Sequence, residues 1–312
     1  MDARHIGSLE MSVVGLGCNN FGGRLDLAGT TAVVDAALDT GITLLDTADV
    51  YGGTKSEEFL GRILAERRGR VVLATKFGIA LDERRKGAKP AYVKRACEDS
   101  LRRLKTDRID LYYLHRPDPE TPIADTLGAL DELVRAGKVR EIGCSHFTAS
   151  QLQEARSAAA TGRRFAAVQN EYSLLVREPE REVLAECERE GLAFVPYYPL
   201  ASGILTGKYR RGRPAPAGTR LAMNPGWNER FLTDPNAARA ESLAAFAASR
   251  GHTLLELAFS WLLRHRVVAS VIAGATSPEQ VRANAAAPRW KLTAEDLARV
   301  DALAPPASGG GP

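Results

Sequence analysis

Four side chains of the kinds that move protons stand at or just after the ends of apolar runs between residues 40 and 120. Asp46 ends the run "TLLD" and Tyr51 follows it in "LLDTADVYGG". Lys76 ends "VVLATK", and His115 ends "DLYYLH". An apolar strand needs no carboxylate, phenol, ammonium or imidazole at its end for packing. These residue types are instead suited to chemistry on an oxygen atom.

The chemistry of the four groups is specific if they meet. An ammonium in a partly dry site needs an anion beside it, and Asp46 supplies one for Lys76. That ammonium favours the phenolate of a neighbouring tyrosine, so we expect the pKa of Tyr51 to fall from about 10 toward the working pH, as a general acid requires. His115 then donates a second hydrogen bond to the same substrate oxygen, as an oxyanion stabiliser or proton relay.

Each of these residues also has a purely structural explanation. Asp46 and Lys76 are compatible with an ion pair inside a sheet, His115 with a core histidine and Tyr51 with a packing residue in a loop. The functional interpretation is favoured because all four fall at the ends of consecutive predicted strands or directly after one. The side chains therefore predict a site that protonates or deprotonates an oxygen.

The elements that must position these residues form a regular alternation. Short apolar runs alternate with amphipathic helical patterns, such as the face shared by Val93, Cys97 and Leu101, along the whole chain. Eight such units in one chain of 312 residues predict an α/β fold, a single-domain (β/α)₈ TIM barrel with its chemistry at the carboxyl ends of the strands. The predicted strands are 13–18, 43–48, 71–76, 110–115, 141–145, 166–171, 193–198 and 269–274.

Three segments lie outside this alternation. The first dozen residues predict a short N-terminal hairpin at the bottom of the barrel. Residues 209–236 are rich in Pro, Gly and Arg and are long for a loop between a strand and a helix, which indicates a functional or mobile segment. We expect the barrel domain to occupy residues 1–304 and a disordered tail to occupy 305–312.

Composition excludes several other classes of protein. A hydrophobic content of 45% with 26% charged residues is ordinary for a globular chain, and 42 Lys and Arg against 38 Asp and Glu, interspersed, predict no nucleic-acid partner. The cysteines at 18, 97, 144 and 187 have no metal-site spacing, which favours reduced thiols and no metal. No cleavage signal or membrane-length apolar segment is visible, so we expect a cytoplasmic protein without membrane attachment.

Several motifs, in order along the chain, strongly resemble the aldo-keto reductases. They are "DTADVYG", "TKFG", "LHRPD", "GCSHF", "QNEYS", "YYPLASGILTGKY" and "GATSPEQVRAN". The resemblance covers nearly the whole chain. It implies a (β/α)₈ barrel, an NADPH or NADH cofactor, and reversible hydride transfer between the nicotinamide and a small-molecule carbonyl or alcohol substrate. The catalytic tetrad of the family falls on Asp46, Tyr51, Lys76 and His115 without substitution.

The resemblance also implies a set of cofactor contacts. Those for the nicotinamide carboxamide fall on Ser145, Gln169 and position 146, where family members usually have asparagine and this chain has His146. An imidazole can still donate one hydrogen bond. The aromatic ring stacked against the nicotinamide falls on Tyr197. The remaining implied contacts are Pro199, Leu200, Ser202, Lys208 and Arg220 for the pyrophosphate, and Gly274, Thr276, Gln280 and Asn284 for the adenosine half. From the first barrel loop, we expect Asn19 and Arg24 to approach the nicotinamide or the substrate.

The implied choice between the two nicotinamides depends on the last of these segments. Many family members place a lysine and an arginine against the 2′-phosphate, where this chain has Gly274 and Gln280. The pattern is more similar to the subgroup that contains the potassium-channel β subunits, which still bind the phosphorylated cofactor. We therefore expect NADPH, with NADH as the alternative.

The sequence also offers two rival interpretations. The segment "GLGCNNFG" (15–22) begins like a dinucleotide-binding fingerprint, but Asn20 occupies its third glycine position and the acidic residues that follow sit in a helical pattern. A nicotinamide-binding, redox-sensing regulatory subunit with little turnover is the alternative function, and His115 disfavours it because channel β subunits replace this histidine. The expected pocket walls, residues 77–90 and 209–236, specify neither a substrate nor an oligomeric state.

Overall fold

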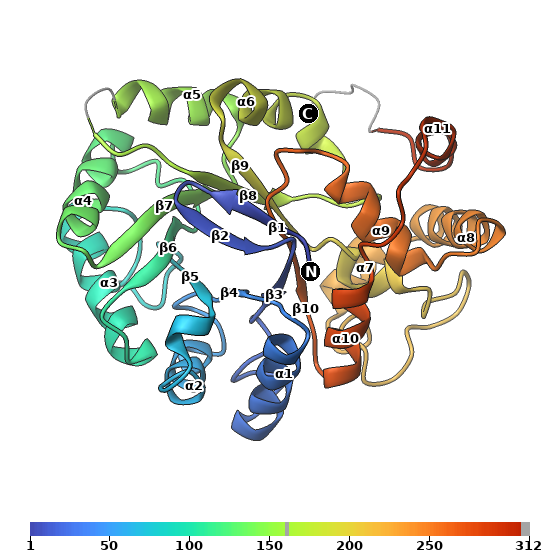
Figure 1. Cartoon of the computed structure of the whole chain (residues 1–312), viewed down its shortest axis with the longest axis horizontal. Coiled ribbons are helices and arrows are strands. Elements are labelled where there is room, and N and C mark those ends of the chain that lie inside the picture. Colours follow the sequence, from blue (N-terminus) through green and yellow to red (C-terminus); the bar gives the residue numbers. More distant parts are fainter. Residues whose placement is uncertain (160–161, 307–312) are drawn as a thin grey trace.

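Eight parallel strands, one at each predicted run, form the centre of the molecule (Figure 1). The structure is a computed structural model and describes residues 1–159 and 162–306. The eight strands are hydrogen-bonded in the order β10-β3-β4-β5-β6-β7-β8-β9. The strands are β3 (Val14–Gly17), β4 (Leu44–Asp46), β5 (Val72–Phe77), β6 (Ile109–Leu114), β7 (Val139–Ser145), β8 (Ala167–Glu171), β9 (Ala193–Tyr197) and β10 (Val271–Gly274).

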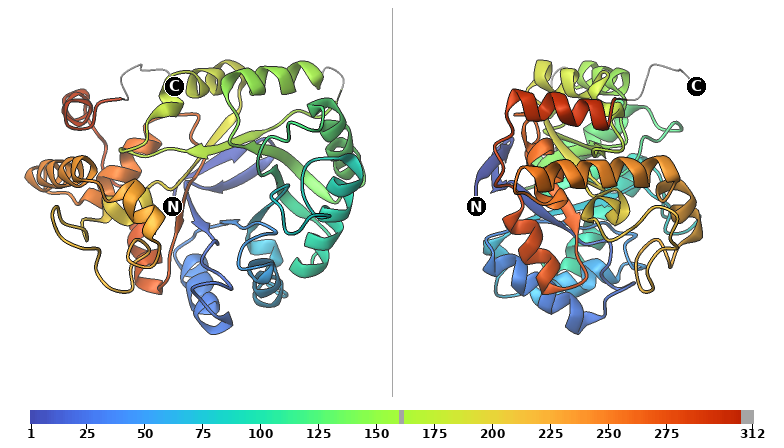
Figure 2. Two further views of the ribbon diagram at one scale, coloured as in Figure 1. Left: turned by 180° about the vertical axis from the view of Figure 1, so that it is seen from behind. Right: turned by 90° about the vertical axis from the view of Figure 1, so that its right-hand side faces the viewer.

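The two ends of this sheet meet through the segment that leads into β10. The Phe194 amide donates to the Val267 carbonyl at 2.7 Å, and the Phe194 carbonyl accepts from the Ala269 amide at 2.9 Å. The sheet is thus a nearly closed barrel, and the predicted (β/α)₈ TIM barrel is confirmed. A ring of helices surrounds it in Figures 1 and 2.

The helices that follow the strands cover the outside of the barrel. Several begin at a side-chain cap that the sequence provides, as in the Thr148/Gln151 capping box and the Thr253/Glu256 capping box. Their apolar faces pack on the outward side chains of the strands. These helices are α1 (Leu27–Asp39), α2 (Lys55–Ile63), α3 (Pro90–Leu104), α4 (Ile123–Arg135), α5 (Ala149–Ala158), α6 (Val183–Glu190), α9 (Leu254–Leu263) and α10 (Pro278–Ala286).

The long excursion after β9 is more ordered than the sequence predicts. It contains a 3₁₀ segment, η3 (Ala201–Thr206), then α7 (Pro225–Phe231) and α8 (Asp234–Ser249). Asn224 caps α7 by accepting from the Trp227 amide at 3.2 Å, with Pro225 at the first helical position. A last helix, α11 (Ala294–Leu303), precedes the predicted tail, of which residues 307–312 lie outside the described residues.

Alternation along each strand decides which side chains point into the barrel. Leu44, Val72 and Leu111 belong to an interior apolar cluster, together with Ala74 and Tyr113 two residues further along. The same period of two, continued by one more step, reaches the residues at the carboxyl ends of the strands. The next members of the β4, β5 and β6 series are the sequence-predicted Asp46, Lys76 and His115.

The predicted N-terminal hairpin closes the other end of the barrel. Strands β1 (Ala3–Ile6) and β2 (Leu9–Ser12) pair antiparallel, with the turn at Gly7 at a φ of 54° that favours glycine. Ile6, Leu9 and Met11 are buried in the interior apolar cluster. The right-hand view of Figure 2 places the hairpin and the segment before α7 at opposite ends of the barrel.

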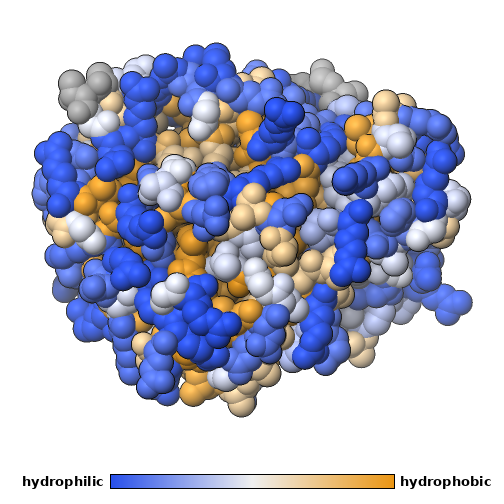
Figure 3. Space-filling view, viewed as in Figure 1, coloured by the Kyte–Doolittle hydropathy of each residue, from blue (hydrophilic) through white to orange (hydrophobic). Residues whose placement is uncertain are grey.

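Most large apolar side chains lie inside the structure. Among the described residues, only Met1 and Met223 are large apolar residues with exposed side chains. The face that carries the hairpin shows hydrophilic residues spread over the surface, with apolar ones in the furrows between elements (Figure 3). The apolar side chains of the hairpin therefore point into the barrel and fill it from below, each fully buried one contributing about 1.5–3 kcal/mol.

Arg4 joins the hairpin to the closing seam of the barrel. Its guanidinium donates to the carbonyls of Leu263 and His265, both at 2.8 Å, and to that of Val268. Because these carbonyls end α9 and begin the segment that completes the barrel, Arg4→Met leaves three acceptors without their donor. We expect a loss of about 2 kcal/mol in the free energy of unfolding, measured by urea denaturation.

His5→Ala is the matched control for this prediction. His5 lies next to Arg4 on the same strand, its side chain is 62% exposed, and its ion pair with Glu10 is on the surface. We expect the control to change the free energy of unfolding by less than about 0.5 kcal/mol. An equal loss in both variants would show that Arg4 has no particular role at the seam.

Candidate active site

Lys76 is the centre of the site at the carboxyl ends of the strands. Its side chain has no exposed surface, and its ammonium donates to the Asp46 carboxylate and to the Thr47 carbonyl, the latter at 2.8 Å. The other Asp46 oxygen accepts from Gln169 Nε2 at 2.9 Å. The buried carboxylate is therefore satisfied on both oxygens, and the buried ammonium has an anion beside it, as the sequence predicts.

The Tyr51 phenol meets this ion pair from the loop after β4. The Lys76 ammonium acts on it electrostatically, and Lys76 Nζ lies 5.1 Å from the centre of the tyrosine ring. On its other side the Tyr51 ring stands edge-on to the His115 imidazole, with 5.9 Å between the ring centres. The structure thus brings together Asp46, Tyr51, Lys76 and His115.

The acidity of Tyr51 differs from the sequence-based expectation. Burial raises the pKa of its phenol, and the Asp46 carboxylate adds to this, while the Lys76 ammonium opposes both. The net direction is upward because burial is the largest of these effects and the Asp46 carboxylate offsets part of the influence of Lys76. The expectation that Lys76 lowers the pKa of Tyr51 below its ordinary value is therefore wrong for the protein alone, and the phenol keeps its proton at neutral pH.

His115 is neutral and has one nitrogen free to act. Burial, followed by the Lys76 charge, lowers the pKa of His115 well below its ordinary value. Its Nδ1 is buried without a hydrogen-bond partner, whereas the residue lines the cavity described next. An N–H at Nδ1 would be buried without an acceptor, which is unfavourable, so the proton belongs on Nε2. The imidazole is then a donor for an oxygen atom in the cavity.

A cavity of about 960 Å³ opens beside the tetrad and extends toward α10. Asp46, Tyr51 and His115 line it, and Lys76 lies directly behind Asp46 and Tyr51. The structure also brings every sequence-predicted cofactor residue to its wall. These are Asn19, Ser145, His146, Gln169, Tyr197, Pro199, Leu200, Ser202, Lys208, Arg220, Gly274, Thr276, Gln280 and Asn284.

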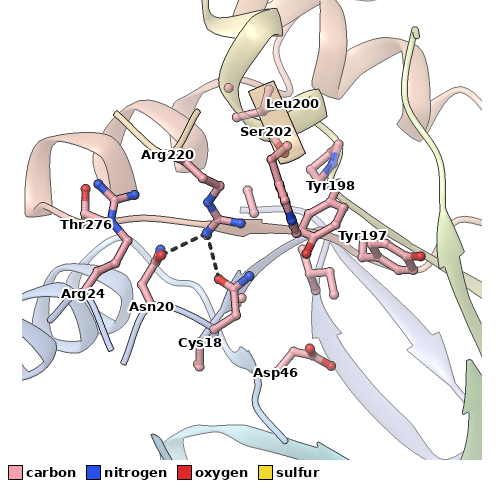
Figure 4. Close-up of a pocket in the computed structure, with 18 of the residues that line it drawn as sticks. Cys18, Asn20, Arg24, Asp46, Tyr197, Tyr198, Leu200, Ser202, Arg220 and Thr276 are labelled. Atoms are coloured by element: carbon pink, nitrogen blue, oxygen red, sulfur yellow. Dashed lines mark hydrogen bonds between the residues drawn. The ribbon is translucent and has the colours of Figure 1, made fainter. Parts of the chain in front are cut away.

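Positive charge is concentrated in one part of this cavity. Arg24, Lys208 and Arg220 all line it, and burial together with the two arginines lowers the pKa of Lys208. Arg220 donates to the side-chain oxygens of Asn19 at 3.2 Å and Asn20 at 2.9 Å, the dashed bonds of Figure 4. Like charges held together in a half-buried wall favour an anionic ligand.

The backbone is strained around the same cavity. His146, Tyr198 and Ser202 line it with φ values of 63°, 51° and 56°, and Ala201 beside them has 44°. Such left-handed conformations are unfavourable for residues other than glycine and persist where the surroundings impose them. Four of the six non-glycine residues with positive φ in the described structure thus lie in or next to this wall.

Several further residues of the cavity wall were not predicted from the sequence. Arg116 and Trp227 line it, as do Glu171 and Arg230, which form an ion pair at 2.6 Å. The sequence contained signals for two of these residues, since Arg116 directly follows His115 and Glu171 continues the inward-facing series of β8 beyond Gln169. Trp227 had none, because its place depends on how the excursion after β9 folds back as α7.

A layer of buried charge supports the site from behind. Glu57 of α2 accepts from Thr75 Oγ1 at 2.5 Å and from Arg103 Nε at 2.6 Å. Asp49, in the loop that carries Tyr51, is 1% exposed, and neither of its carboxyl oxygens has a side-chain donor. Burial and the nearby Glu57 carboxylate raise the pKa of Asp49 to about 8.

Because of Asp49, we expect the stability of the folded protein to depend on pH. Its pKa of about 8 in the folded protein lies above the ordinary value near 4, so between these values the folded state holds a proton that the unfolded state has lost. Stability must therefore fall as the pH rises through this window. We expect the free energy of unfolding of the wild type, relative to Asp49→Asn, to drop by about 3 kcal/mol between pH 5 and 7.5 in urea titrations.

Asp107→Asn is the control, because the side chain of Asp107 is 87% exposed. Its difference from the wild type should stay constant with pH to within about 0.5 kcal/mol. A constant difference for Asp49→Asn as well would contradict the assignment, since it would mean that Asp49 ionises at the same pH in the folded and unfolded states.

Among residues 1–159 and 162–306, no three or more His, Cys, Asp or Glu side chains are grouped so that they could hold a metal ion. Within these same ranges, no helix combines the length and apolar character needed to span a membrane.

The architecture and the position of the site define an enzyme class, since (β/α)₈ barrels carry their active sites at the carboxyl ends of the strands. A family model described as the aldo/keto reductase family matches residues 13–305. The chain belongs to the aldo-keto reductase family. The family resemblance on which the sequence analysis relied is therefore confirmed.

Two solved structures are similar over nearly the whole chain. The glycerol dehydrogenase AKR11B4 from Gluconobacter oxydans is 31% identical, with a TM-score of 0.84, over 97% of this chain and 94% of its own. The aldo-keto reductase AKR11C1 from Bacillus halodurans, in its holo form, is 33% identical, with a TM-score of 0.81, over 98% of this chain and 97% of its own. Family and neighbours together support an oxidoreductase of carbonyl compounds.

Proposed function

We propose that this chain is an NADPH-dependent oxidoreductase that reversibly reduces a small aldehyde or ketone to an alcohol, with Tyr51 as the general acid. The observation that carries the proposal is Lys76, a fully buried ammonium in contact with both the Asp46 carboxylate and the Tyr51 phenol. A purely structural ion pair would not need a phenol that opens onto a cavity of about 960 Å³.

The cavity wall fits a nicotinamide dinucleotide. The Tyr197 ring lies beside the tetrad end, and Arg24 and Thr276 lie on the opposite side of the close-up view (Figure 4). The Ser202 hydroxyl in the wall is buried without a hydrogen-bond partner, which suits an acceptor such as a phosphate oxygen. The N-terminus of α10, capped by Ser277, adds a partial positive charge near Thr276 and Gln280.

The residues of the chain supply the acid–base half of the reaction. When bound, a reduced nicotinamide supplies the hydride that the carbonyl carbon receives. Tyr51 gives its proton to the carbonyl oxygen, and Lys76 stabilises the phenolate that remains. His115 donates from Nε2 to the same oxygen and stabilises the charge that develops there. Asp46 holds Lys76 in place and keeps it charged.

The raised pKa of Tyr51 fixes the direction of the pH dependence. In the reduction direction the phenol must begin protonated, and burial ensures this at neutral pH. Oxidation of an alcohol needs the phenolate, so its rate should rise with pH over the range in which reduction stays level.

The same proposal includes the broader predictions made from the sequence. We propose that residues 1–304 form the catalytic barrel and that the partners are small-molecule carbonyls or alcohols. We also propose a cytoplasmic location, supported by four cysteines that are all buried as free thiols.

Replacement of Tyr51 by phenylalanine is the direct test. Tyr51→Phe keeps the ring but has no proton to give, so we expect turnover of an aromatic aldehyde to fall by about 10²- to 10⁴-fold, as measured by NADPH oxidation. The dissociation constant of NADPH should stay within about twofold, because binding does not use the phenol hydroxyl. Tyr209→Phe is the control, since Tyr209 is buried but does not line the cavity.

Wild-type turnover separates an enzyme from a regulatory subunit. Repeated oxidation of NADPH by excess aldehyde is expected of the enzyme and would be barely measurable for a redox-sensing subunit. Unchanged turnover in Tyr51→Phe would remove this tyrosine from the mechanism.

The preference for NADPH is tested separately. Arg24, Lys208 and Arg220 and the α10 N-terminus give the wall an excess of positive charge, which favours the ligand with the additional phosphate. We expect NADPH to bind at least about tenfold more tightly than NADH in calorimetric titrations, and the ratio to shrink as the salt concentration is raised. Equal affinities at low salt would contradict the preference.

A further inference from the structure

His146 uses both of its ring nitrogens within the protein. It directly follows β7, and its ring lies between two others, 6.4 Å from His115 and 5.2 Å from Tyr197 between ring centres. Nδ1 is 3.1 Å from the His115 carbonyl oxygen and 3.0 Å from Ser145 Oγ. Nε2 is 2.9 Å from the Tyr197 hydroxyl.

These contacts determine which nitrogen carries the proton. A carbonyl oxygen only accepts hydrogen bonds, so Nδ1 must donate to His115. Ser145 offers no alternative donor, because its hydroxyl already donates to the Gln169 carbonyl at 2.7 Å. Burial lowers the pKa of His146, against a smaller opposing effect of the His115 carbonyl, so the ring is neutral and has a single N–H. Nε2 is then an acceptor, and the Tyr197 hydroxyl donates to it.

The Tyr197 ring is therefore held at two points. His146 fixes its hydroxyl, and Tyr198 packs edge-on against it with 4.9 Å between ring centres at 84°. The imidazole also joins Tyr197 to the backbone of His115, whose ring contacts Tyr51. The wall of the cavity and the proposed acid are in this way connected through a row of four rings.

We propose that His146 is a positioning residue that orients the Tyr197 ring, and that it does not donate a hydrogen bond to the nicotinamide carboxamide. The inference deepens the proposed function, because it takes Tyr197 as the surface against which the nicotinamide stacks. The only N–H of the His146 ring donates to the His115 carbonyl. The contribution of His146 to cofactor binding then passes entirely through the Tyr197 hydroxyl.

A double-mutant cycle on NADPH affinity distinguishes the two roles of His146. Tyr197→Phe keeps the stacking ring and removes the hydroxyl, and His146→Ala removes the imidazole. If His146 acts through Tyr197, each variant should weaken NADPH binding by about three- to tenfold, and the double variant should bind no more weakly than the weaker-binding single variant. Multiplied effects in the double variant would overturn the proposal, because they would show an independent contact of His146 with the cofactor.

A second Tyr–His pair provides the matched control. Tyr172 and His265 are also joined by a hydrogen bond, at 3.1 Å, in which the Tyr172 hydroxyl accepts because it already donates to Glu180 at 2.6 Å, and neither residue lines the cavity. We expect Tyr172→Phe to leave the NADPH dissociation constant within about twofold, whatever it does to stability. A loss like that of Tyr197→Phe would attribute the effect to general loosening and would overturn the proposal.

A spectroscopic measurement tests the hydrogen bond without any cofactor. In ¹⁵N spectra of the protein alone, His146, assigned by its loss in His146→Ala, should show a protonated Nδ1 and an unprotonated Nε2. The Nε2 resonance should shift in Tyr197→Phe and stay in place in Tyr172→Phe. A protonated Nε2, or one that ignores the loss of the Tyr197 hydroxyl, would overturn the inference even if NADPH binds, whereas absence of NADPH binding alone would contradict only the proposed function.

Discussion

A positive charge with no exposed surface is the constraint on which the arrangement of the barrel depends. Burying the Lys76 ammonium costs several kcal/mol unless an anion and further acceptors surround it, so Asp46 and the Thr47 carbonyl must be in place. Asp46 in turn takes its second donor from Gln169, across the barrel. The position of one ammonium thus determines which side chains are needed, and where they must lie, on strands that are far apart in the sequence.

The dependence continues into residues with no chemistry of their own. Gln169 also acts on the Tyr113 phenol, a fully buried side chain beside Lys76, whose Nζ lies 6.0 Å from the centre of the tyrosine ring. Tyr113 needs the space left by Gly143, where an added Cβ would lie 2.5 Å from its ring. A glycine in the middle of β7 is therefore required for packing, since a side chain there would displace a ring that helps to orient the buried ion pair.

Much of the fold and of the site follows from two periodicities in the sequence, that of the helices and that of the strands. Alternation in the strands places Asp46, Lys76 and His115 on the inward side, and closure of the barrel brings these three strand ends together. The family motifs extend this to the cavity wall, which includes residues as far apart in sequence as Gly274 and Lys208. The hairpin was also predictable, because its apolar residues alternate around a glycine turn.

What the sequence could not show depends on burial and on the path of the chain in space. The direction in which the pKa of Tyr51 moves is a balance between lost hydration, which raises it, and the charge of Lys76, which Asp46 offsets only in part, and no motif expresses that balance. The helix α7 and its Trp227 have no strand period to place them. Likewise, the bonds of His146 follow from an atypical residue meeting a distant tyrosine, which only the folded chain reveals.

The bonds between Arg220 and the amide side chains of Asn19 and Asn20 also affect the thermodynamics of any anion that enters the cavity. They join residues some 200 positions apart in the sequence, so the Arg220 guanidinium already has protein hydrogen-bond partners before any anion binds. An arriving phosphate must exchange with these neutral acceptors, and its net gain is the difference between two sets of hydrogen bonds. Substituting Asn19 or Asn20 would alter that reference state and thereby the binding strength, without removing any of the cationic side chains of the wall.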